Sequence, residues 1–183
     1  LQKRASPAIT LAISFAPAAV GAPGDARAAS PLFTEAELVK RVRSLNEAYF
    51  NDFRHPETHV LYGARLSTKA RWTSPADVLA ENPHPWGYGS RIADTALHSG
   101  HVLVALLDAH DARPDPFLRE NIARTFAALR FIGSLPETHP KPGKPALAGL
   151  VPRGPHPDDP AAWYDDSSMD QHTTYIISLA RYA

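Results

Sequence analysis

The part of the sequence that decides the fold reads Gly149-Leu-Val-Pro-Arg-Gly-Pro-His-Pro-Asp-Asp-Pro-Ala-Ala-Trp-Tyr-Asp-Asp-Ser-Ser-Met-Asp-Gln-His-Thr-Thr-Tyr175. A short apolar run enters a proline-rich loop, and two aromatic residues then precede a helix that opens on acidic and hydroxylic side chains. Asp166 suits the N-cap, because its carboxylate can accept a backbone N–H of the first turn. Asp170 then lies one turn inside the helix, on the same face. A polar and aromatic loop that ends at the positive end of a helix favours binding of a polar ligand.

A second stretch, Gly87-Tyr-Gly-Ser-Arg-Ile-Ala-Asp94, has the same organisation. Ser90 can cap a helix, an aspartate follows four residues later, and the preceding loop also carries a Trp and a Tyr. This weak internal repeat predicts a fold built of helical hairpins, in which two equivalent helices begin near Ser90 and Asp166.

Hydrophobic periodicity predicts four main helices and almost no sheet, with the helices over 34–53, 90–111, 116–133 and 167–183. A short helix over 74–81 and a short strand over 59–62 are also indicated. The second and fourth main helices are expected to be buried and to lie side by side with their N-termini at the same end. The third is amphipathic. Thr34 and Glu37 form a capping box for the first helix, and Gly133 with Pro136 is expected to end the third.

Composition excludes several classes of protein. The 183 residues contain 19 Lys+Arg and 19 Asp+Glu, so the basic face that a nucleic-acid binder needs is not indicated. Cysteine is absent, which removes disulfides, thiolate metal sites and a cysteine nucleophile. No P-loop, Rossmann glycine pattern or G-x-S-x-G elbow occurs in the sequence. We therefore expect no nucleic-acid partner.

Residues 1–29 have the pattern of an export signal. A basic start at Lys3 and Arg4 precedes a mostly apolar run over 8–20, and Ala26-Arg-Ala28 offers a small-x-small cleavage site. The run is too short to span a membrane, and a disordered Ala/Pro-rich tail is the alternative. The pattern predicts a secreted or periplasmic protein whose domain covers 30–183. The sequence ends in the middle of a helical pattern, so we expect this domain to be truncated at its C-terminus.

The segment from Gly87 to Tyr182 resembles the six-hairpin (α/α)-toroid superfamily, which includes many glycoside hydrolases and polysaccharide lyases. Three runs carry the resemblance, over 87–94, 149–154 and 164–175. The resemblance implies an all-α fold in which inner and outer helices alternate, with a sugar-binding cleft at one end of the barrel. A complete toroid needs about twelve helices, so residues 30–183 are predicted to form an incomplete toroid, its N-terminal part.

Asp94, Asp170 and His172 are the candidate catalytic residues. A carboxylate inside an apolar helix is costly to bury unless it is paired. Each aspartate therefore also has a structural interpretation: Asp170 as an ion-pair partner of Arg153 or Arg91, and Asp94 as a local salt-bridge partner of Arg91 at the i,i+3 spacing. The histidine can be a general acid or base, or a hydrogen-bonded core residue.

Candidate substrate-binding residues surround these positions, and they are Trp86, Tyr88, Arg153, Trp163, Tyr164, Asp166 and Gln171. The planar fork of Arg153 suits a carboxylate, whereas capping alone would explain Asp166. Aromatic rings can stack on sugars, although most such rings pack loops onto helices. Asp94 and Asp170 are expected to open onto one cleft, with Arg153, Trp163 and Tyr164 on its rim. A separation of about 6.5–9.5 Å, typical of inverting glycosidases, is expected between the two carboxylates.

His98 and His101 share a helix face at the i,i+3 spacing of metal ligands, but no H-E-x-x-H pattern completes the set. We therefore expect no metal site and no cofactor. Two functional classes remain. The first is a glycoside hydrolase or polysaccharide lyase that acts on an oligo- or polysaccharide, including uronic-acid-containing ones, by carboxylate acid/base chemistry. The second is a non-catalytic glycan-binding or structural α-toroid protein.

Overall fold

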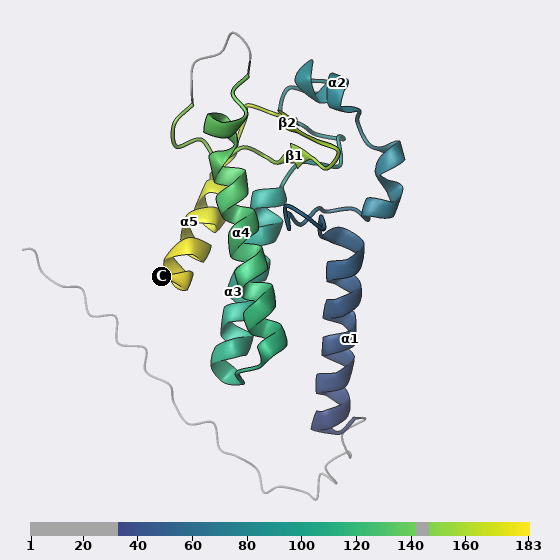
Figure 1. Cartoon of the computed structure of the whole chain (residues 1–183), viewed down its shortest axis with the longest axis vertical. Coiled ribbons are helices and arrows are strands. Elements are labelled where there is room, and N and C mark those ends of the chain that lie inside the picture. Colours follow the sequence, from purple (N-terminus) through teal and green to yellow (C-terminus); the bar gives the residue numbers. More distant parts are fainter. Residues whose placement is uncertain (1–32, 142–146) are drawn as a thin grey trace, which may run out of the picture.

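The computed structural model describes residues 33–141 and 147–183, so the predicted signal peptide lies outside the described residues. The described chain is mostly helical with little strand, which confirms the all-α class. Its elements, in order, are α1 (Glu35–Phe53), the 3-10 helix η1 (Leu66–Arg71), α2 (Pro75–Leu79), α3 (Thr95–Ala112), α4 (Pro116–Thr138), β1 (Pro155–His156), β2 (Asp159–Trp163) and α5 (Met169–Tyr182) (Figure 1). No helix in this part of the chain is both long and apolar enough to cross a membrane.

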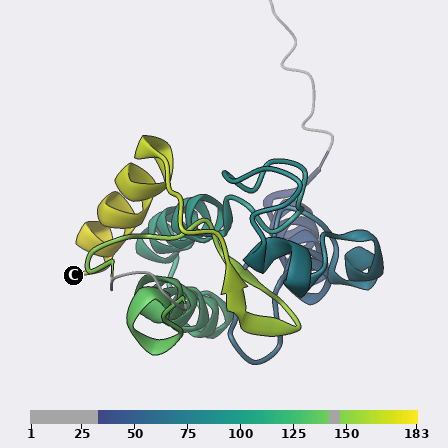
Figure 2. The same cartoon turned by 90° about the horizontal axis from the view of Figure 1, so that it is seen from above.

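Helix α3 lies between α4 on one side and α5 on the other (Figure 2). Gly100 permits a close approach to α5, because a Cβ atom there would lie 2.7 Å from Thr174 Cγ2. At the N-terminal ends of the two helices Gln171 Nε2 donates to Asp94 Oδ1 at 2.8 Å. At their C-terminal ends Arg181 ion-pairs with acidic residues of α3. The predicted arrangement, side by side with the N-termini at the same end, is therefore confirmed.

Helix α4 is amphipathic, as predicted. Its buried face carries Ile122, Thr125, Leu129 and Ile132. The prediction that Gly133 and Pro136 end the helix is wrong, since α4 continues to Thr138. Gly133 instead makes room for α5, because a Cβ atom there would lie 3.1 Å from Tyr175 Cζ. Pro136 is tolerated near the end of the helix, where its missing N–H removes a single intrahelical hydrogen bond.

The capping box of α1 is confirmed. Glu37 N donates to Thr34 Oγ1 at 3.3 Å, and Thr34 N donates to Glu37 Oε2 at 2.8 Å. The apolar stripe of α1 stays exposed over most of the helix, and Phe50 near the C-terminal end is its buried residue. Side chains nevertheless connect α1 with the start of α4, because Arg43 Nη1 lies 3.5 Å from Asp115 Oδ2 and the Arg43 guanidinium lies 4.8 Å from the centre of the Phe117 ring.

Helix α5 is less buried than predicted. Gln171 and Ser178 are its buried residues, whereas Ile176 and Ile177 are exposed. The reason is that α5 packs on α3 with one face, while no other helix of the described residues covers the opposite face.

Loops gather over the N-terminal ends of α3 and α5, at the top of Figure 1. A buried cluster there includes Val60, Tyr62, Ile92, Val151 and Tyr164. The strand predicted over 59–62 is reduced to one antiparallel bridge outside the named strands. The antiparallel hairpin of β1 and β2 was not predicted, because its prolines indicate a loop. These prolines are compatible with the hairpin because each strand of a two-stranded sheet has a free edge, where the N–H that proline lacks is not needed for pairing.

Candidate functional site

Arg153 is the centre of the site and lies inside the protein, 4% exposed, rather than on a rim as predicted. Its Nη1 donates to Asp94 Oδ1 at 3.1 Å and its Nε donates to Asp166 Oδ2 at 3.1 Å. The guanidinium carbon lies 5.1 Å from the centre of the Tyr88 ring. The arginine therefore joins the ends of α3 and α5 through two charge-assisted hydrogen bonds.

Asp94 does not lie one turn inside a helix, because α3 begins at Thr95 rather than near Ser90. Arg91 and Asp94 both have positive φ, 72° and 70°, and the loop thus extends to the start of the helix. The cap comes from elsewhere in the chain. Thr95 N and Oγ1 donate to the carbonyl oxygen of Arg153 at 2.9 and 2.8 Å. This tertiary contact replaces the local Ser90 cap that the sequence indicates.

One carboxylate oxygen of Asp94 is held by hydrogen bonds, and the other is free to accept a hydrogen bond from a ligand. Oδ1 accepts hydrogen bonds from both Arg153 and Gln171, and the side chain remains 39% exposed. Within the described part of the chain no hydrogen bond to Oδ2 is present. Gln171 is fully buried, and its Oε1 has no hydrogen-bond partner there. Asp94 is therefore a carboxylate with a set orientation and a free acceptor.

Asp166 is not the N-cap of α5, contrary to the prediction. Ser168 occupies that position, and Asp166 is directed to Arg153 instead. Asp170 is exposed rather than buried. The hydroxyl of Ser168 donates to Asp170, and this hydrogen bond is the main cause that lowers the pKa of that carboxyl. The two carboxylates that pair with Arg153 are therefore those of Asp94 and Asp166, and Asp170 does not pair with it.

His172 is held by hydrogen bonds at both ring nitrogens. Val151 N donates to its Nε2 at 3.4 Å, and its Nδ1 lies 2.9 Å from Ser167 Oγ. With Nε2 as acceptor, Nδ1 carries the proton and donates to the serine. This geometry favours the interpretation of His172 as a hydrogen-bonded structural residue.

The four candidate aromatic residues divide into two pairs. Trp163 and Tyr164 are buried, contrary to their predicted place on a rim. Trp163 Nε1 donates to the His139 carbonyl at 3.0 Å, so its polar atom is used inside the fold. Trp86 and Tyr88 are 52% and 54% exposed, and their ring centres lie 6.1 Å apart in an edge-to-face arrangement. Only this second pair has ring surface available to a ligand.

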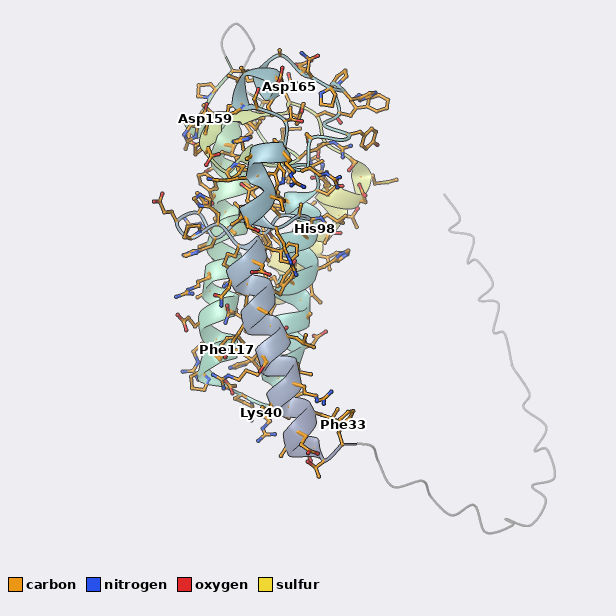
Figure 3. The ribbon with its side chains drawn as sticks, turned by 90° about the vertical axis from the view of Figure 1, so that its right-hand side faces the viewer. Phe33, Lys40, His98, Phe117, Asp159 and Asp165 are labelled. Atoms are coloured by element: carbon orange, nitrogen blue, oxygen red, sulfur yellow. The ribbon has the colours of Figure 1, made fainter. Side chains whose placement is uncertain are left out.

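A hollow of about 280 Å³ opens beside Tyr88. Its lining includes Gly63, Gly87, Tyr88, Arg91, Asp94 and His98, so Asp94 opens onto it whereas Asp170 and His172 do not line it. Burial lowers the pKa of His98, which keeps the imidazole neutral at neutral pH. Figure 3 labels His98 below the loops that cover the end of α3.

The contributions of Gly63, Arg91 and His98 to the hollow were not predicted. Gly63 belongs to a loop that is distant in sequence from His98 but packs on its ring. Local sequence patterns cannot predict such a tertiary contact. The sequence pattern indicates His98 only as a possible metal ligand together with His101. Among the described residues no group of three or more His, Asp or Glu side chains could hold a metal ion.

No family model matches the chain, and neither a curated protein nor a solved structure matches it. The resemblance to the six-hairpin toroid superfamily therefore rests on the sequence runs quoted above. The function has to be argued from the geometry around Asp94.

Proposed function

We propose that the protein is a carbohydrate-active enzyme of polysaccharide-lyase type, which acts on a uronic-acid-containing glycan in the hollow beside Tyr88. The observation that carries the proposal is the grouping of Arg91, Asp94 and His98 around one hollow, next to exposed aromatic rings. The export signal predicted over residues 1–29 is consistent with an activity outside the cytoplasm.

Binding is assigned to the aromatic rings and to Arg91. Trp86 and Tyr88 present apolar faces that can stack on the C–H faces of sugar rings. The side chain of Arg91 is exposed and forms no ion pair within the described residues. A guanidinium forms two parallel hydrogen bonds with a carboxylate, which suits the carboxylate of a uronic acid.

Elimination needs one base and one group that neutralises the uronate carboxylate. Neutral His98 removes the proton next to that carboxylate, the C–H electron pair forms a double bond, and the glycosidic oxygen leaves with the electrons of its bond to carbon. The proton held by His98 then passes to the leaving oxygen. Asp94 stabilises the imidazolium formed in between, as its charge already favours the protonated form of His98.

A glycoside hydrolase fits this geometry less well. Hydrolysis with inversion or retention uses two carboxyl groups on opposite sides of the scissile bond. Among the described residues that line the hollow, Asp94 is the one carboxylate. Elimination, which can proceed with a single base, therefore has the better support.

We also propose that α3 and α5 are neighbouring inner helices of an (α/α) toroid and that α4 is an outer helix. Support comes from the parallel packing of α3 and α5, and from α4 being amphipathic and following α3 after a short turn. The exposed apolar face of α5 is then the surface on which a further hairpin would pack.

The test measures product formation from uronic-acid-containing and from neutral polysaccharides, with ultraviolet absorbance reporting the unsaturated uronate. Asp94→Asn and His98→Gln are expected to reduce the rate about 100-fold or more, because each removes a charge or a base from the reacting group. Asp170→Asn, which alters an exposed carboxylate outside the hollow, is the matched control and should keep wild-type activity. New reducing ends without absorbance would assign a hydrolase, and wild-type activity of Asp94→Asn would refute the role of Asp94.

A non-catalytic glycan-binding protein is the second candidate, favoured by the exposed rings of Trp86 and Tyr88 with the half-buried ring of His84 beside them. The His84 ring lies 5.1 Å from the Trp86 ring and 5.4 Å from the Tyr88 ring. Such a platform can bind sugars without any reaction. In that case glycan binding would be measurable without turnover, and Trp86→Ala would weaken it whereas His98→Gln would not.

A further inference from the structure

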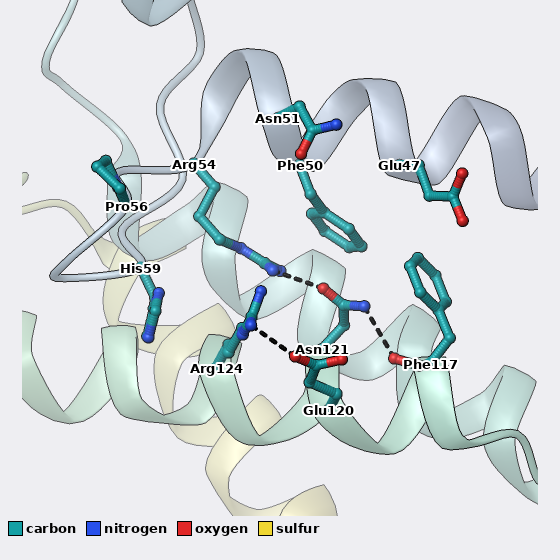
Figure 4. Close-up of a pocket in the computed structure, with 10 residues that line it drawn as sticks. All are labelled: Glu47, Phe50, Asn51, Arg54, Pro56, His59, Phe117, Glu120, Asn121 and Arg124. Carbon is teal, nitrogen blue, oxygen red and sulfur yellow. Dashed lines mark hydrogen bonds and ion pairs between the residues drawn. The ribbon is translucent and has the colours of Figure 1, made fainter.

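A second pocket, of about 440 Å³, lies on another side of the molecule, between the end of α1, the turn that follows it and the first half of α4. Figure 4 shows the side chains that line it, with Arg54 and Arg124 close together and His59 beside them. None of its lining residues belongs to the hollow beside Tyr88. The two sites are therefore separate.

Arg54 is the unusual residue of this pocket, since it is buried at 6% exposure without a carboxylate partner. Its Nη1 donates to Asn121 Oδ1 at 2.5 Å and its Nη2 donates to Thr125 Oγ1 at 3.3 Å. The guanidinium carbon lies 3.8 Å from the centre of the Phe50 ring. Among the described residues no carboxylate oxygen lies within 4.0 Å of it, and its Nε has no hydrogen-bond partner. Within the described chain Arg54 thus donates to two neutral groups only, and some of its five N–H donors remain without an acceptor.

The acidic residues that line the pocket are already paired with other cations. Glu120 Oε1 lies 2.5 Å from Arg124 Nη2, and Glu47 Oε1 lies 3.2 Å from Arg43 Nε. The two arginines and two glutamates that line the pocket balance in formal charge, but neither glutamate forms an ion pair with Arg54. Burial, and secondly the positive charge of Arg124, lower the pKa of Arg54 to about 10, so it stays charged at neutral pH. A buried cation without a counter-ion is costly, and an anion that enters the pocket removes this cost.

We propose that this pocket binds a small molecule through a carboxylate or phosphate group, with Arg54 as the counter-charge and Arg124 at the entrance. Arg124 is about half exposed and can turn towards such a group, because its bond to Glu120 joins two exposed side chains. His59 lines the same pocket, and burial followed by the charges of Arg124 and Arg54 lowers its pKa. The neutral imidazole supplies one N–H donor without adding charge.

The experiment measures thermal unfolding of the protein at constant ionic strength, with sodium chloride replaced stepwise by inorganic phosphate or by acetate. A ligand of the folded state raises the midpoint as its concentration passes its Kd. We expect a rise of about 2–6 °C in at least one of the two series. A rise in phosphate alone assigns a phosphate-bearing ligand, and a rise in acetate alone assigns a carboxylate. No rise over chloride in either series overturns the proposal.

Variants locate the effect. Arg54→Met removes the buried charge and keeps much of the side-chain volume, and it is expected to abolish the rise. Arg124→Gln alters an exposed side chain at the entrance, so it keeps the fold and should weaken anion binding about tenfold. Arg130→Gln, on an exposed face of α4 outside the pocket, is the matched control and should keep the full effect.

Equal rises in wild type, Arg124→Gln and Arg130→Gln would show non-specific ion binding and would overturn the assignment, even if Arg54→Met failed to fold. Asp94→Asn should leave the anion titration unchanged. Failure of the proposed lyase activity therefore does not decide this proposal, and the converse also holds.

Discussion

Replacement of Arg153 by methionine tests how the candidate site is held together. The change removes two hydrogen bonds of 3.1 Å each, to Asp94 and to Asp166. A hydrogen bond to a charged group contributes about 1.5–3 kcal/mol when it is intact. The two carboxylates are 39% and 30% exposed, so water can replace part of what they lose. The carbonyl that caps Thr95 belongs to the backbone and remains. We therefore expect the free energy of unfolding to fall by about 2–3 kcal/mol, less than the sum of two such bonds.

Urea unfolding followed by circular dichroism measures this change. With a slope of about 2 kcal/mol/M, the midpoint of Arg153→Met should fall by about 1–1.5 M while the slope stays constant. Arg153→Lys should give an intermediate value, because one ammonium group cannot match a fork that serves two carboxylates from Nη1 and Nε. Arg130→Met, at an exposed position of α4, should stay within about 0.5 kcal/mol of wild type.

Equal midpoints for Arg153→Met and Arg130→Met would refute the reasoning. That result would mean that the two ion pairs contribute nothing measurable. The ends of α3 and α5 would then be held by packing and by backbone contacts alone.

Three further changes test other parts of the structure. Gly154→Ala should lower the free energy of unfolding by about 2–4 kcal/mol in the same urea assay, because φ is +143° there and a Cβ atom would collide with Thr95. Gly133→Ala should cost about 1–3 kcal/mol by crowding Tyr175, and Tyr175→Phe in the same chain should recover part of that loss. Burial lowers the pKa of His98 below 6.5, so the unfolded chain binds the proton more readily as the pH falls. Unfolding free energy should therefore fall from pH 7 to pH 5, and His98→Gln should make that dependence weaker; an unchanged pH profile would contradict this.

Local signals in the sequence were sufficient to predict that the helices exist, but not where each of them begins and ends. The capping box of Thr34 with Glu37 and the amphipathic pattern before Gly133 describe interactions within one or two turns, and both are present. The predicted end of α4 is wrong, because glycine and proline are local stop signals whereas the contact of Gly133 with Tyr175 is tertiary.

The candidate site was predicted less well, for a related reason. Asp166 looked like a cap, but Arg153 offers it a charged partner, and Ser168 takes the cap position. Trp163 is buried and Trp86 is exposed. This difference depends on how the loops pack on one another, and the two loops have similar sequence patterns, so the sequence could not predict it. The repeat placed Asp94 and Asp170 at equivalent positions, yet the backbone turn at Arg91 and Asp94 shifts the start of α3 and breaks that equivalence.

The contacts of Arg153 determine when the orientation of Asp94 is set. One residue caps α3 with its carbonyl and binds the carboxylate of Asp94 with its side chain, so both contacts are already present in the folded protein. A ligand that arrives later meets a carboxylate that no longer has rotational freedom to lose. The entropic cost of aligning this group therefore falls on folding, and neither binding nor any reaction in the hollow has to supply reorganisation energy for it.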